Sequence, residues 1–466
     1  MTRFLLLILS CLGVNVAVAA AAAVSARPNV VFILADDLGY ADLGSYGGAL
    51  IETPHLDRLA TDGMRFTQAY AGSSVCAPSR AALLTGKHMG HASVRHNQKA
   101  GDDLEPGELT LGSLLQRAGY VTACIGKWGV GYAPAPTSPN AHGFDHFFGY
   151  VDMWHAHNSY PEFLWRNGEK VPLRNEVERL TSHVKNPLVG YATKKIDFSP
   201  ELTTREALTW LDQRSDPRPF FLYLPFTIPH ENGEAQFQDQ RVEVPDLGIY
   251  ADRDWSPDEK AKAALVTYLD DQVGQLLAKL TAKGFASNTL VIFTSDNGAG
   301  DQWDARFRSN QPFSGDKHTF REGGIRVPLI ARWPGRIAPN SISHHPTAFW
   351  DIMPTLAELA SVDSPSQTDG LSLVPTLLGQ GSQPEHEYLY WEMPAADLFE
   401  QAVRWGNWKA IKSIRRTHTD FELYDLSADP AERFNSAAQH PEIVHRIELQ
   451  MKASHSHREG SHHPHG

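Results

Sequence analysis

Residues 29–37 read NVVFILADD, a near-continuous apolar run that ends in two carboxylates. A second run, TLVIFTSDNG at residues 289–298, ends in a similar way, in Asp296, Asn297 and a glycine. Runs of this kind are typical of strands that are buried on both faces, as in a parallel sheet. Because ligands of such sheets gather beyond the carboxyl ends of the strands, we expect both polar pairs at one functional edge.

The segments between and around these two strands alternate between helix-like and strand-like patterns. Helix-like patterns cover residues 107–118, 200–214 and 257–283, and shorter strand-like runs cover residues 120–125 and 219–224. This alternation predicts an α/β fold, in which a mainly parallel sheet carries helices on both faces.

The pattern changes after about residue 370. Short strand-like segments cover residues 387–392, 401–406, 408–413 and 421–426, and a helix-like segment covers residues 440–453. We interpret this part as a smaller α+β subdomain with an antiparallel sheet. The expected division is a main α/β domain over residues 27–370, a C-terminal subdomain over residues 371–454 and a histidine-rich disordered tail over residues 455–466.

The first 26 residues resemble a secretory signal peptide, with a basic start at Arg3, an apolar body and small residues for cleavage. This predicts an exported protein, periplasmic or extracellular, although an uncleaved membrane anchor or lipidation at Cys11 would also fit. No later segment is apolar enough to cross a membrane, so no stable membrane span is expected in the mature chain. The formal charge of −12, from 42 Lys and Arg against 54 Asp and Glu, argues against nucleic-acid binding.

The stretch SSVCAPSRAALLTG at residues 73–86 predicts a short helix that runs from its proline to its last glycine. Cys76 then stands at the N-terminal end, where free backbone N–H groups, the helix dipole and Arg80 favour a bound anion. The other cysteine beyond the leader, Cys124, lies in the apolar run VTACIGKW and is interpreted as a core thiol. Because a lone free thiol is liable to oxidation in an exported protein, Cys76 is either buried or chemically special.

Four oxygen-bearing side chains follow the two buried strands: Asp36, Asp37, Asp296 and Asn297. A single strand-terminal Asp is usually a turn or cap residue, but two pairs at equivalent strand ends favour a metal site. Oxygen ligands suit a hard divalent cation such as Ca²⁺, whereas zinc and copper usually require nitrogen or sulfur.

Several motifs, taken together and in order, resemble the type I sulfatases of the alkaline phosphatase superfamily. The resemblance covers essentially the whole chain after the leader. It is carried by Asp36-Asp37, Cys76-Ala77-Pro78-Ser79-Arg80 with Ala81-Ala82-Leu83-Leu84-Thr85-Gly86 behind it, Gly126-Lys127-Trp128, Pro229-His230, Ser295-Asp296-Asn297-Gly298, Lys317 followed by Glu322-Gly323-Gly324, and Glu422-Leu423-Tyr424-Asp425-Leu426.

The resemblance implies that a separate maturation enzyme oxidises Cys76 to formylglycine, an aldehyde that hydrates to a geminal diol. It also implies that residue 76 and the four strand-end side chains hold Ca²⁺, in preference to Mg²⁺. One diol hydroxyl would attack sulfur and expel the alcohol, and the second would release sulfate and restore the aldehyde.

The same resemblance assigns further roles. Arg80, Lys127 and Lys317 would meet the charge of the sulfate oxygens, and His230 would hydrogen-bond the ester oxygen or protonate the leaving alcohol. Many family members carry a histidine two residues after the motif lysine, but this chain has Gly129 there. The group that takes the second proton is therefore open.

The candidates for that proton are two histidines of the segment TGKHMGH, His88 and His91, and a metal-bound carboxylate.

The Gly-Lys-Trp-Gly motif, TGKHMGH, residues 155–173 and TIPHENGEA resemble a subgroup of bacterial exported sulfatases that act on sulfated carbohydrates. An aromatic-rich structural loop is the competing interpretation of residues 155–173, where Asn167-Gly168 predicts a hairpin turn. The candidate sugar contacts are Trp154, His155, His157 and Asn158, with Asn232, Arg306 and Arg308 as further candidates.

We therefore expect hydrolysis of a sulfate monoester on a carbohydrate, with a galactose-type sugar as the candidate. A phosphomonoester or phosphonate ester hydrolase of the same superfamily is the first alternative. A catalytically silent Ca²⁺-dependent carbohydrate-binding protein, in which Gly129 marks lost chemistry, is the second.

Overall fold

The computed structural model describes residues 27–97, 103–131, 137–180, 186–238, 241–395 and 397–456. The expected signal peptide and all but the first two residues of the expected tail lie outside these ranges. Among the described residues, no helix is both long and apolar enough to cross a membrane.

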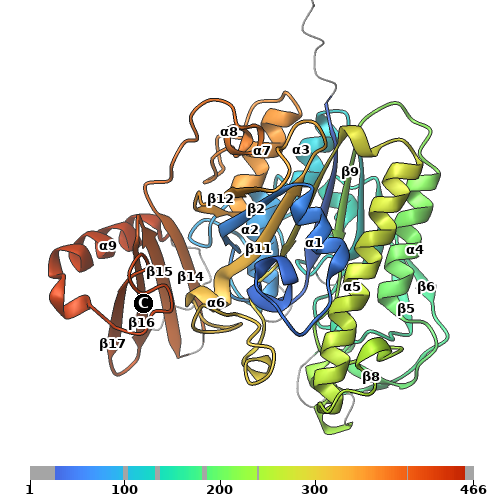
Figure 1. Ribbon diagram of the computed structural model, residues 1–466, viewed down its shortest axis with the longest axis horizontal. Helices are drawn as coiled ribbons and strands as arrows, with labels where there is room; N and C mark the ends of the chain where they lie inside the picture. The colour runs from blue at the N-terminus through green and yellow to red at the C-terminus, as the bar shows by residue number, and fades with distance from the viewer. Residues whose placement is uncertain are drawn as a thin grey trace, which may run out of the picture.

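A large mixed sheet forms the centre of the molecule (Figure 1). Strand β1 (Asn29–Ala35) lies between β10 (Thr289–Ser295) and β9 (Phe220–Pro225), parallel to both. The parallel part continues through β3 (Val121–Lys127) and β4 (His146–Tyr150). The prediction of a mainly parallel sheet built around residues 29–35 and 289–295 is therefore confirmed.

The two edges of this sheet are more mixed than the sequence predicts. On one side, β11 (Arg326–Arg332) and β2 (Met64–Tyr70) run antiparallel to their neighbours, and β12 (Ser341–Ser343) and β13 (Thr347–Ala348) then pair parallel with β2. On the other side lies the predicted hairpin, β5 (Phe163–Arg166) and β6 (Glu169–Pro172). Its turn residues Asn167 and Gly168 both have positive φ, as a tight two-residue turn requires. A separate two-stranded sheet contains β7 (Glu176–Arg179) and β8 (Gly190–Lys194).

Helices cover both faces of the central sheet. Alternate side chains of β1 enter two different hydrophobic cores, with Val31 and Ile33 on one face and Phe32 and Leu34 on the other. The first face packs against α1 (Pro54–Thr61), α4 (Ser199–Asp212) and α5 (Pro257–Ala282). The second packs against α2 (Cys76–Thr85), α3 (Leu111–Arg117), α7 (Ile352–Leu359) and α8 (Val374–Leu378).

The C-terminal part forms an antiparallel sheet beside the main one (Figure 1). Its strands follow in sequence order, β14 (Leu389–Pro394), β15 (Leu398–Trp405), β16 (Trp408–Arg415) and β17 (Thr419–Asp425), and α9 (Pro441–Ser454) packs on it. The predicted antiparallel α+β arrangement is confirmed. Leu373 and Leu377, which follow the expected boundary at residue 370, still belong to a core of the central sheet.

A buried charge cluster joins the two sheets. Glu322, in the short helix α6 (Glu322–Ile325), lies 3.1 Å from Nζ of Lys409 in β16 and 3.0 Å from the guanidinium of Arg326. The hydroxyl of Tyr70 donates a 2.7 Å hydrogen bond to the same carboxylate. The C-terminal sheet is thereby tied to the loop and strand that follow Lys317.

Candidate active site

The two polar pairs, Asp36-Asp37 and Asp296-Asn297, lie side by side because they follow the neighbouring parallel strands β1 and β10. In the register of β1 and β10, Ala35 lies opposite Ser295, so the residues that follow are neighbours. The backbone N–H of Asp37 donates to Oδ1 of Asp296 at 3.1 Å, and Asp37 itself has a φ of 62°. All four side chains are buried.

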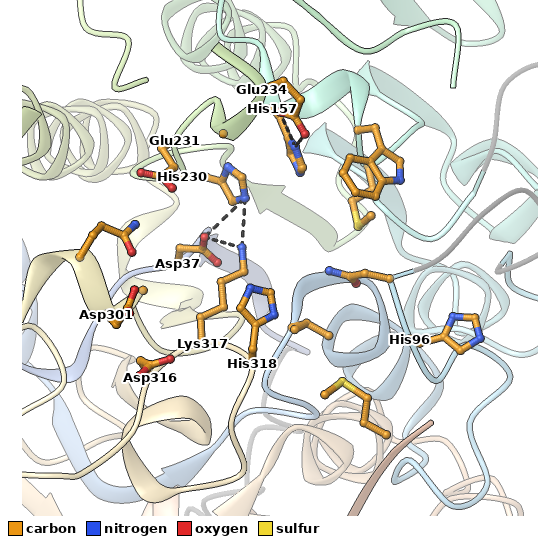
Figure 2. Close-up of a pocket in the computed structure, with 18 of the residues that line it drawn as sticks. Asp37, His96, His157, His230, Glu231, Glu234, Asp301, Asp316, Lys317 and His318 are labelled. Carbon is orange, nitrogen blue, oxygen red and sulfur yellow. Dashed lines mark hydrogen bonds and ion pairs between the residues drawn. The ribbon is translucent and has the colours of Figure 1, made fainter. Parts of the chain in front are cut away.

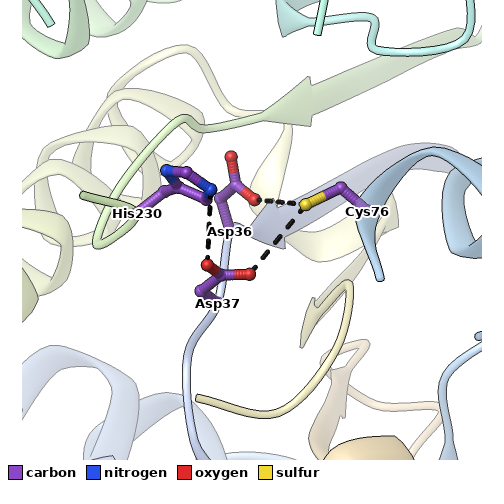
Figure 3. Close-up of side chains that lie close together, drawn as sticks. All are labelled: Asp36, Asp37, Cys76 and His230. Carbon is purple, nitrogen blue, oxygen red and sulfur yellow. Dashed lines mark hydrogen bonds and ion pairs between the residues drawn. The ribbon is translucent and has the colours of Figure 1, made fainter. Parts of the chain in front are cut away.

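Cys76 is the first residue of α2, and its side chain points at this group (Figure 3). Its Sγ lies 3.6 Å from Oδ1 of Asp36 and 4.0 Å from Oδ1 of Asp37. Burial raises the pKa of the Cys76 thiol to about 12, so the thiol is protonated at neutral pH. Because the thiolate is the nucleophilic form, unmodified Cys76 is a poor nucleophile here.

The N-terminal end of α2 offers fewer free backbone N–H groups than the sequence suggests. The N–H of Ala77 already donates to Oδ1 of Asn97 at 2.9 Å, and Pro78 has none to offer. Arg80 is completely buried and turns its side chain toward Asp296, at 2.8 Å, and toward the carbonyl of Lys127. Positive charge near Cys76 therefore comes from side chains, with the helix end contributing through its dipole.

Three cationic side chains face the three carboxylates. Besides Arg80 on Asp296, Lys127 lies 2.7 Å from Oδ2 of Asp36, and Lys317 lies 2.6 Å from Oδ2 of Asp37.

These cations set the charge state of two carboxylates. Burial alone would raise the pKa values of Asp36 and Asp37, but the facing cations outweigh it. They hold the pKa of Asp36 well below its usual range, chiefly through Lys127, and that of Asp37 at about 2, chiefly through Lys317. Burial and the charge of Asp36 raise the pKa of Asp296 against the opposing charge of Arg80. Asp36 and Asp37 are therefore held in their ionised form, whereas ionisation of Asp296 is disfavoured.

His230 lies at the open side of this cluster. Its Nε2 is 3.1 Å from Nζ of Lys317 and 3.4 Å from Oδ2 of Asp37. Because a lysine ammonium only donates, Nε2 accepts and the ring proton resides on Nδ1, which is buried with no hydrogen-bond partner among the described residues. Burial and the charge of Lys317 lower the pKa of His230 to about 3. The imidazole is therefore neutral in this arrangement.

The carboxylate and amide oxygens of this cluster suit a hard cation. Ligand atoms of Asp36, Asp37, Cys76 and His230 all lie within 4.8 Å of one another (Figure 3). The amide nitrogen of Asn297 donates to Oδ1 of Asp37 at 2.7 Å and to a backbone carbonyl. This orientation leaves Oδ1 of Asn297 buried and without a hydrogen-bond partner among the described residues. A bound cation would satisfy that oxygen.

Gly129 occupies the position where many family members carry a histidine, and it lies next to Arg80 and Lys127. It has a φ of 76°, and a Cβ atom there would lie 3.1 Å from Cδ of Arg80. His88 and His91, the proposed substitutes, lie beyond the C-terminal end of α2. Their rings stack at 4.3 Å, and Nδ1 of His91 is 2.8 Å from Asp369. They are anchored at the opposite end of the helix from Cys76, so neither occupies the place of the missing side chain.

A cavity of about 640 Å³ opens over Asp37, His230 and Lys317 (Figure 2). Of the seven expected sugar contacts, Trp154 and His157 line it. Its wall also contains polar residues that the sequence did not identify: His96, Asn97, Glu231, Glu234, Arg241, Asp301, Gln302, Asp316 and His318, with Met393 from β14 at the rim. Glu231 and His318 directly follow motif residues, which could have identified them, whereas no local signal marks His96 or Met393.

The other five expected sugar contacts are not among the described residues that line this cavity. His155 is buried against Tyr150, and the side chains of Asn158 and Asn232 hydrogen-bond backbone groups. Arg306 forms a 2.7 Å ion pair with Glu259, and Arg308 is exposed and not among the described residues that line the cavity. Residues 155–158 thus combine both interpretations, because His157 faces the cavity while its neighbours serve packing and backbone hydrogen bonding.

Comparison with known proteins agrees with this arrangement. The family model described as Sulfatase matches residues 28–362, and the one described as N-sulphoglucosamine sulphohydrolase, C-terminal, matches residues 313–457. The chain therefore belongs to the sulfatase family of the alkaline phosphatase-like superfamily. It is a sulfuric ester hydrolase.

The similarity to individual relatives covers nearly the whole chain. Arylsulfatase A of Homo sapiens is 34% identical over 480 residues, which cover 93% of this chain and 89% of the relative. N-acetylgalactosamine-6-sulfatase of Mus musculus is 32% identical over 468 residues, covering 92% and 85%. The solved structure of Ps i-CgsB in complex with k-i-k-neocarrahexaose superposes with a TM-score of 0.78 at 25% identity, covering 94% of this chain and 95% of that one.

Proposed function

We propose that this sulfatase hydrolyses sulfate monoesters of carbohydrates by means of a formylglycine made from Cys76. Ca²⁺ would be held by Asp36, Asp37, Asp296 and Asn297 together with residue 76. The observation that carries the proposal is the proximity of buried Cys76 to Asp36 and Asp37. Each of these carboxylates is in turn paired with a lysine. The sulfatase family generally uses a formylglycine and a divalent metal.

The chemistry of the two absent groups complements what the chain provides. A hydrated formylglycine supplies a hydroxyl nucleophile that the protonated Cys76 thiol does not, and a bound Ca²⁺ supplies Lewis acidity at the sulfate oxygens. Arg80 keeps Asp296 and the carbonyl of Lys127 in place beside residue 76.

The charge balance of the cluster supports an anionic substrate. Three carboxylates face three cationic side chains, so a divalent ion would add a surplus of positive charge. A sulfate ester, and then the sulfate dianion, would meet that surplus. Lys317, at the cavity edge, can turn its ammonium from Asp37 toward a sulfate oxygen with the least rearrangement.

The cavity supports a neutral sugar as the substrate unit. Trp154 supplies an aromatic surface of the kind that packs against sugar rings. Asp301 and Asp316 lie close together on the cavity wall, where burial and neighbouring carboxylates, Asp301 first, raise the pKa of Asp316 to about 6 (Figure 2). A sugar carboxylate would be repelled there, whereas the hydroxyls of a galactose-type unit would find acceptors. The relatives that act on N-acetylgalactosamine sulfate or bind neocarrahexaose support the same substrate class.

The proposal includes export and maturation. Residues 1–26 would direct the chain to the periplasm or the exterior, and a formylglycine-generating enzyme would convert Cys76 before or during export.

Mass spectrometry of the peptide that contains residue 76, from protein made in its native host, tests the nucleophile. Conversion of thiol to aldehyde lowers the mass by about 18 units, and Cys76→Ala should abolish sulfate release. Cys124→Ala is the matched control, because Cys124 is equally buried, in β3, and is not one of the side chains grouped with Asp36 and Asp37 among the described residues. An unmodified thiol in fully active enzyme would refute the formylglycine mechanism.

Substrate class is tested by measuring sulfate release from 4-nitrophenyl sulfate and from 6- and 4-sulfated galactose and N-acetylgalactosamine, with 4-nitrophenyl phosphate for comparison. We expect sulfate to be released from at least one of the sugars, and the aryl sulfate to be cleaved faster than the aryl phosphate. Faster cleavage of the phosphate would instead favour a phosphoesterase.

A further inference from the structure

We infer that Glu432, in the loop that follows β17, positions Lys317 for its contact with sulfate. The inference rests on the proposed function and adds a positioning residue to it. Glu432 stands six residues after the ELYDL motif at residues 422–426, in a part of the sequence to which the proposed function assigns no task. It is not among the described residues that line the cavity, so it acts through the loop that carries Lys317.

The backbone of Glu432 is fixed by a turn. Its N–H donates to the carbonyl of Asp429 at 3.1 Å. The carboxylate of Asp429 accepts the N–H groups of Arg433 and Phe434, at 2.6 and 2.9 Å. Glu432 itself has a φ of 51° and is only 3% exposed. Because a residue other than glycine keeps a positive φ only where its surroundings hold it there, this side chain starts from a well-defined position.

The Glu432 carboxylate binds both ends of the loop at residues 314–322. Its Oε2 accepts the hydroxyl of Ser314 at 2.9 Å and the N–H of Glu322 at 2.8 Å. The N–H of Gly323 also donates to the carbonyl of Ser314, at 2.7 Å. Lys317 lies between the two ends, three residues after Ser314 and five before Glu322. One carboxylate oxygen therefore closes the base of the loop that carries this lysine.

Other side chains of the C-terminal subdomain fasten the same base. Nζ of Lys409, which lies 3.4 Å from Oε1 of Glu432, donates to the carbonyl of Phe320 at 2.7 Å. The guanidinium of Arg321 lies 2.9 Å from the carboxylate of Glu422 and donates to the carbonyl of Glu432 at 3.0 Å. The base of the loop is thus bound to the C-terminal sheet and to the segment that follows it.

The tip of the loop is bound to the central sheet and its neighbouring segments instead. The N–H of Lys317 donates to the carbonyl of Ala299 at 3.0 Å, and that of His318 to the carbonyl of Ser74 at 2.9 Å. Both side chains line the cavity (Figure 2). Lys317 therefore occupies a loop that spans the two parts of the molecule, and its place over the cavity depends on both attachments. Misplacement by about 1 Å through a remote substitution can cost about a hundredfold in rate.

Kinetics of Glu432 variants test the inference. The amide of Glu432→Gln can still accept hydrogen bonds from the base of the loop, but it presents no charge to Lys409. We expect its kcat/KM for 4-nitrophenyl sulfate to fall about tenfold and its KM to rise about threefold or more. Glu432→Ala removes the acceptor and should lose more. Ser314→Ala removes one hydrogen bond only, and should shift both constants in the same direction by less. KM does not depend on how much of the enzyme is folded, so a loss of stability alone would leave it unchanged.

Hydrogen exchange tests the geometry without relying on activity. In Glu432→Gln, the amides of a peptide that covers residues 314–322 should exchange about tenfold faster than in the wild type, because the base of the loop opens more readily. Exchange that becomes faster only outside residues 314–322 would show that Glu432 does not hold this loop.

Asp351 provides the matched control. Its buried carboxylate accepts the N–H of Ala348 at 2.8 Å and the hydroxyl of Thr347 at 3.1 Å, and it faces His386 at 2.7 Å. It is not among the described residues that line the cavity. Asp351→Asn should lose stability and keep its KM within about twofold of the wild type.

Unchanged kinetic constants in folded Glu432→Gln, or an equal rise of KM in Asp351→Asn, would overturn this inference alone. A wild-type enzyme that releases no sulfate from any ester would overturn the proposed function, and the exchange of residues 314–322 would still decide whether Glu432 holds the loop.

Discussion

Nζ of Lys127 lies 2.7 Å from Oδ2 of Asp36, and neither side chain is exposed to solvent. Such a pair is costly to break from one side, because the remaining charge stays buried without compensation. The lysine therefore has a structural role in addition to the proposed contact with sulfate.

Replacing Lys127 by Met should lower the free energy of unfolding by about 3–5 kcal/mol and abolish sulfate release. Denaturant unfolding and turnover of 4-nitrophenyl sulfate measure the two effects. Lys262→Met is the matched control, because Lys262 forms an equally buried 3.1 Å ion pair with Asp42 away from Cys76. It should cost similar stability but leave the turnover of the folded fraction near wild type. Loss of turnover without loss of stability in Lys127→Met would contradict the structural role.

Replacing Asn297 should weaken the binding of Ca²⁺. We expect added Ca²⁺ to raise the melting temperature of the wild type, since a ligand that binds only the folded state stabilises it. Asn297→Ala removes the orphan Oδ1, and the Ca²⁺ concentration needed for half of that shift should rise about tenfold or more. Asn310→Ala is the control, because both polar atoms of Asn310 bond to Ala299. If the two variants respond alike to Ca²⁺, Asn297 is not a ligand.

Gly129 should resist replacement by any residue with a Cβ. Gly129→Ala combines a positive φ with a contact 3.1 Å from Cδ of Arg80, so it should cost more than about 1 kcal/mol of stability and lower kcat. Gly168→Ala isolates the backbone contribution, because Gly168 also has a positive φ but open space around it. That control should lose stability and keep its activity. Full activity in Gly129→Ala would show that Arg80 tolerates the crowding.

The buried cluster at Glu322 should contribute to acid unfolding. Burial would raise the pKa of this carboxyl, but Lys409, Arg326 and Arg404 outweigh burial and bring it to about 2. Since the pKa is lower in the folded than in the unfolded protein, the stabilisation is present above about pH 4.5 and is lost as the pH falls toward 2.

The variant Glu322→Gln cannot ionise, so it should be less stable than wild type at pH 7. The difference in free energy of unfolding should shrink between pH 4.5 and pH 2, as measured by urea unfolding at a series of pH values. A difference that stays constant over this range would mean that the charge of Glu322 contributes nothing.

The strands and long helices were predictable because their patterns are local. The apolar runs at residues 29–35 and 289–295 became β1 and β10 at those bounds, and α5 begins and ends within one residue of its expected range. The helix expected over residues 107–118 begins only at Leu111, because the hydroxyl of Thr110 caps its first turn. Short edge strands such as β12 and β13 lack a pattern long enough to detect.

The site residues likewise differ in whether a local sequence pattern marks them. Its strand-end oxygens could be found from the sequence, since they directly follow the apolar runs. Lys317 stands in a polar loop and could be found only through the family resemblance. The sequence does not show which polar side chains hydrogen-bond the backbone, as those of Asn158 and Asn232 do, instead of lining the cavity. The pairing of His157 with Glu234 joins segments 77 residues apart and needs the fold to be seen.

The placement of Met393 and its neighbours Pro394 and Ala395 at the cavity rim has a consequence for how such enzymes diversify. The bond-breaking groups come from the edge of the central sheet and the loops beside it, whereas this part of the entrance comes from the end of β14 in the other sheet. Substitutions at residues 393–395 can therefore alter which sulfate esters enter the cavity without changing a charged side chain around Cys76. Residues that determine the reaction and residues that shape this part of the entrance therefore lie on different sheets and can change independently.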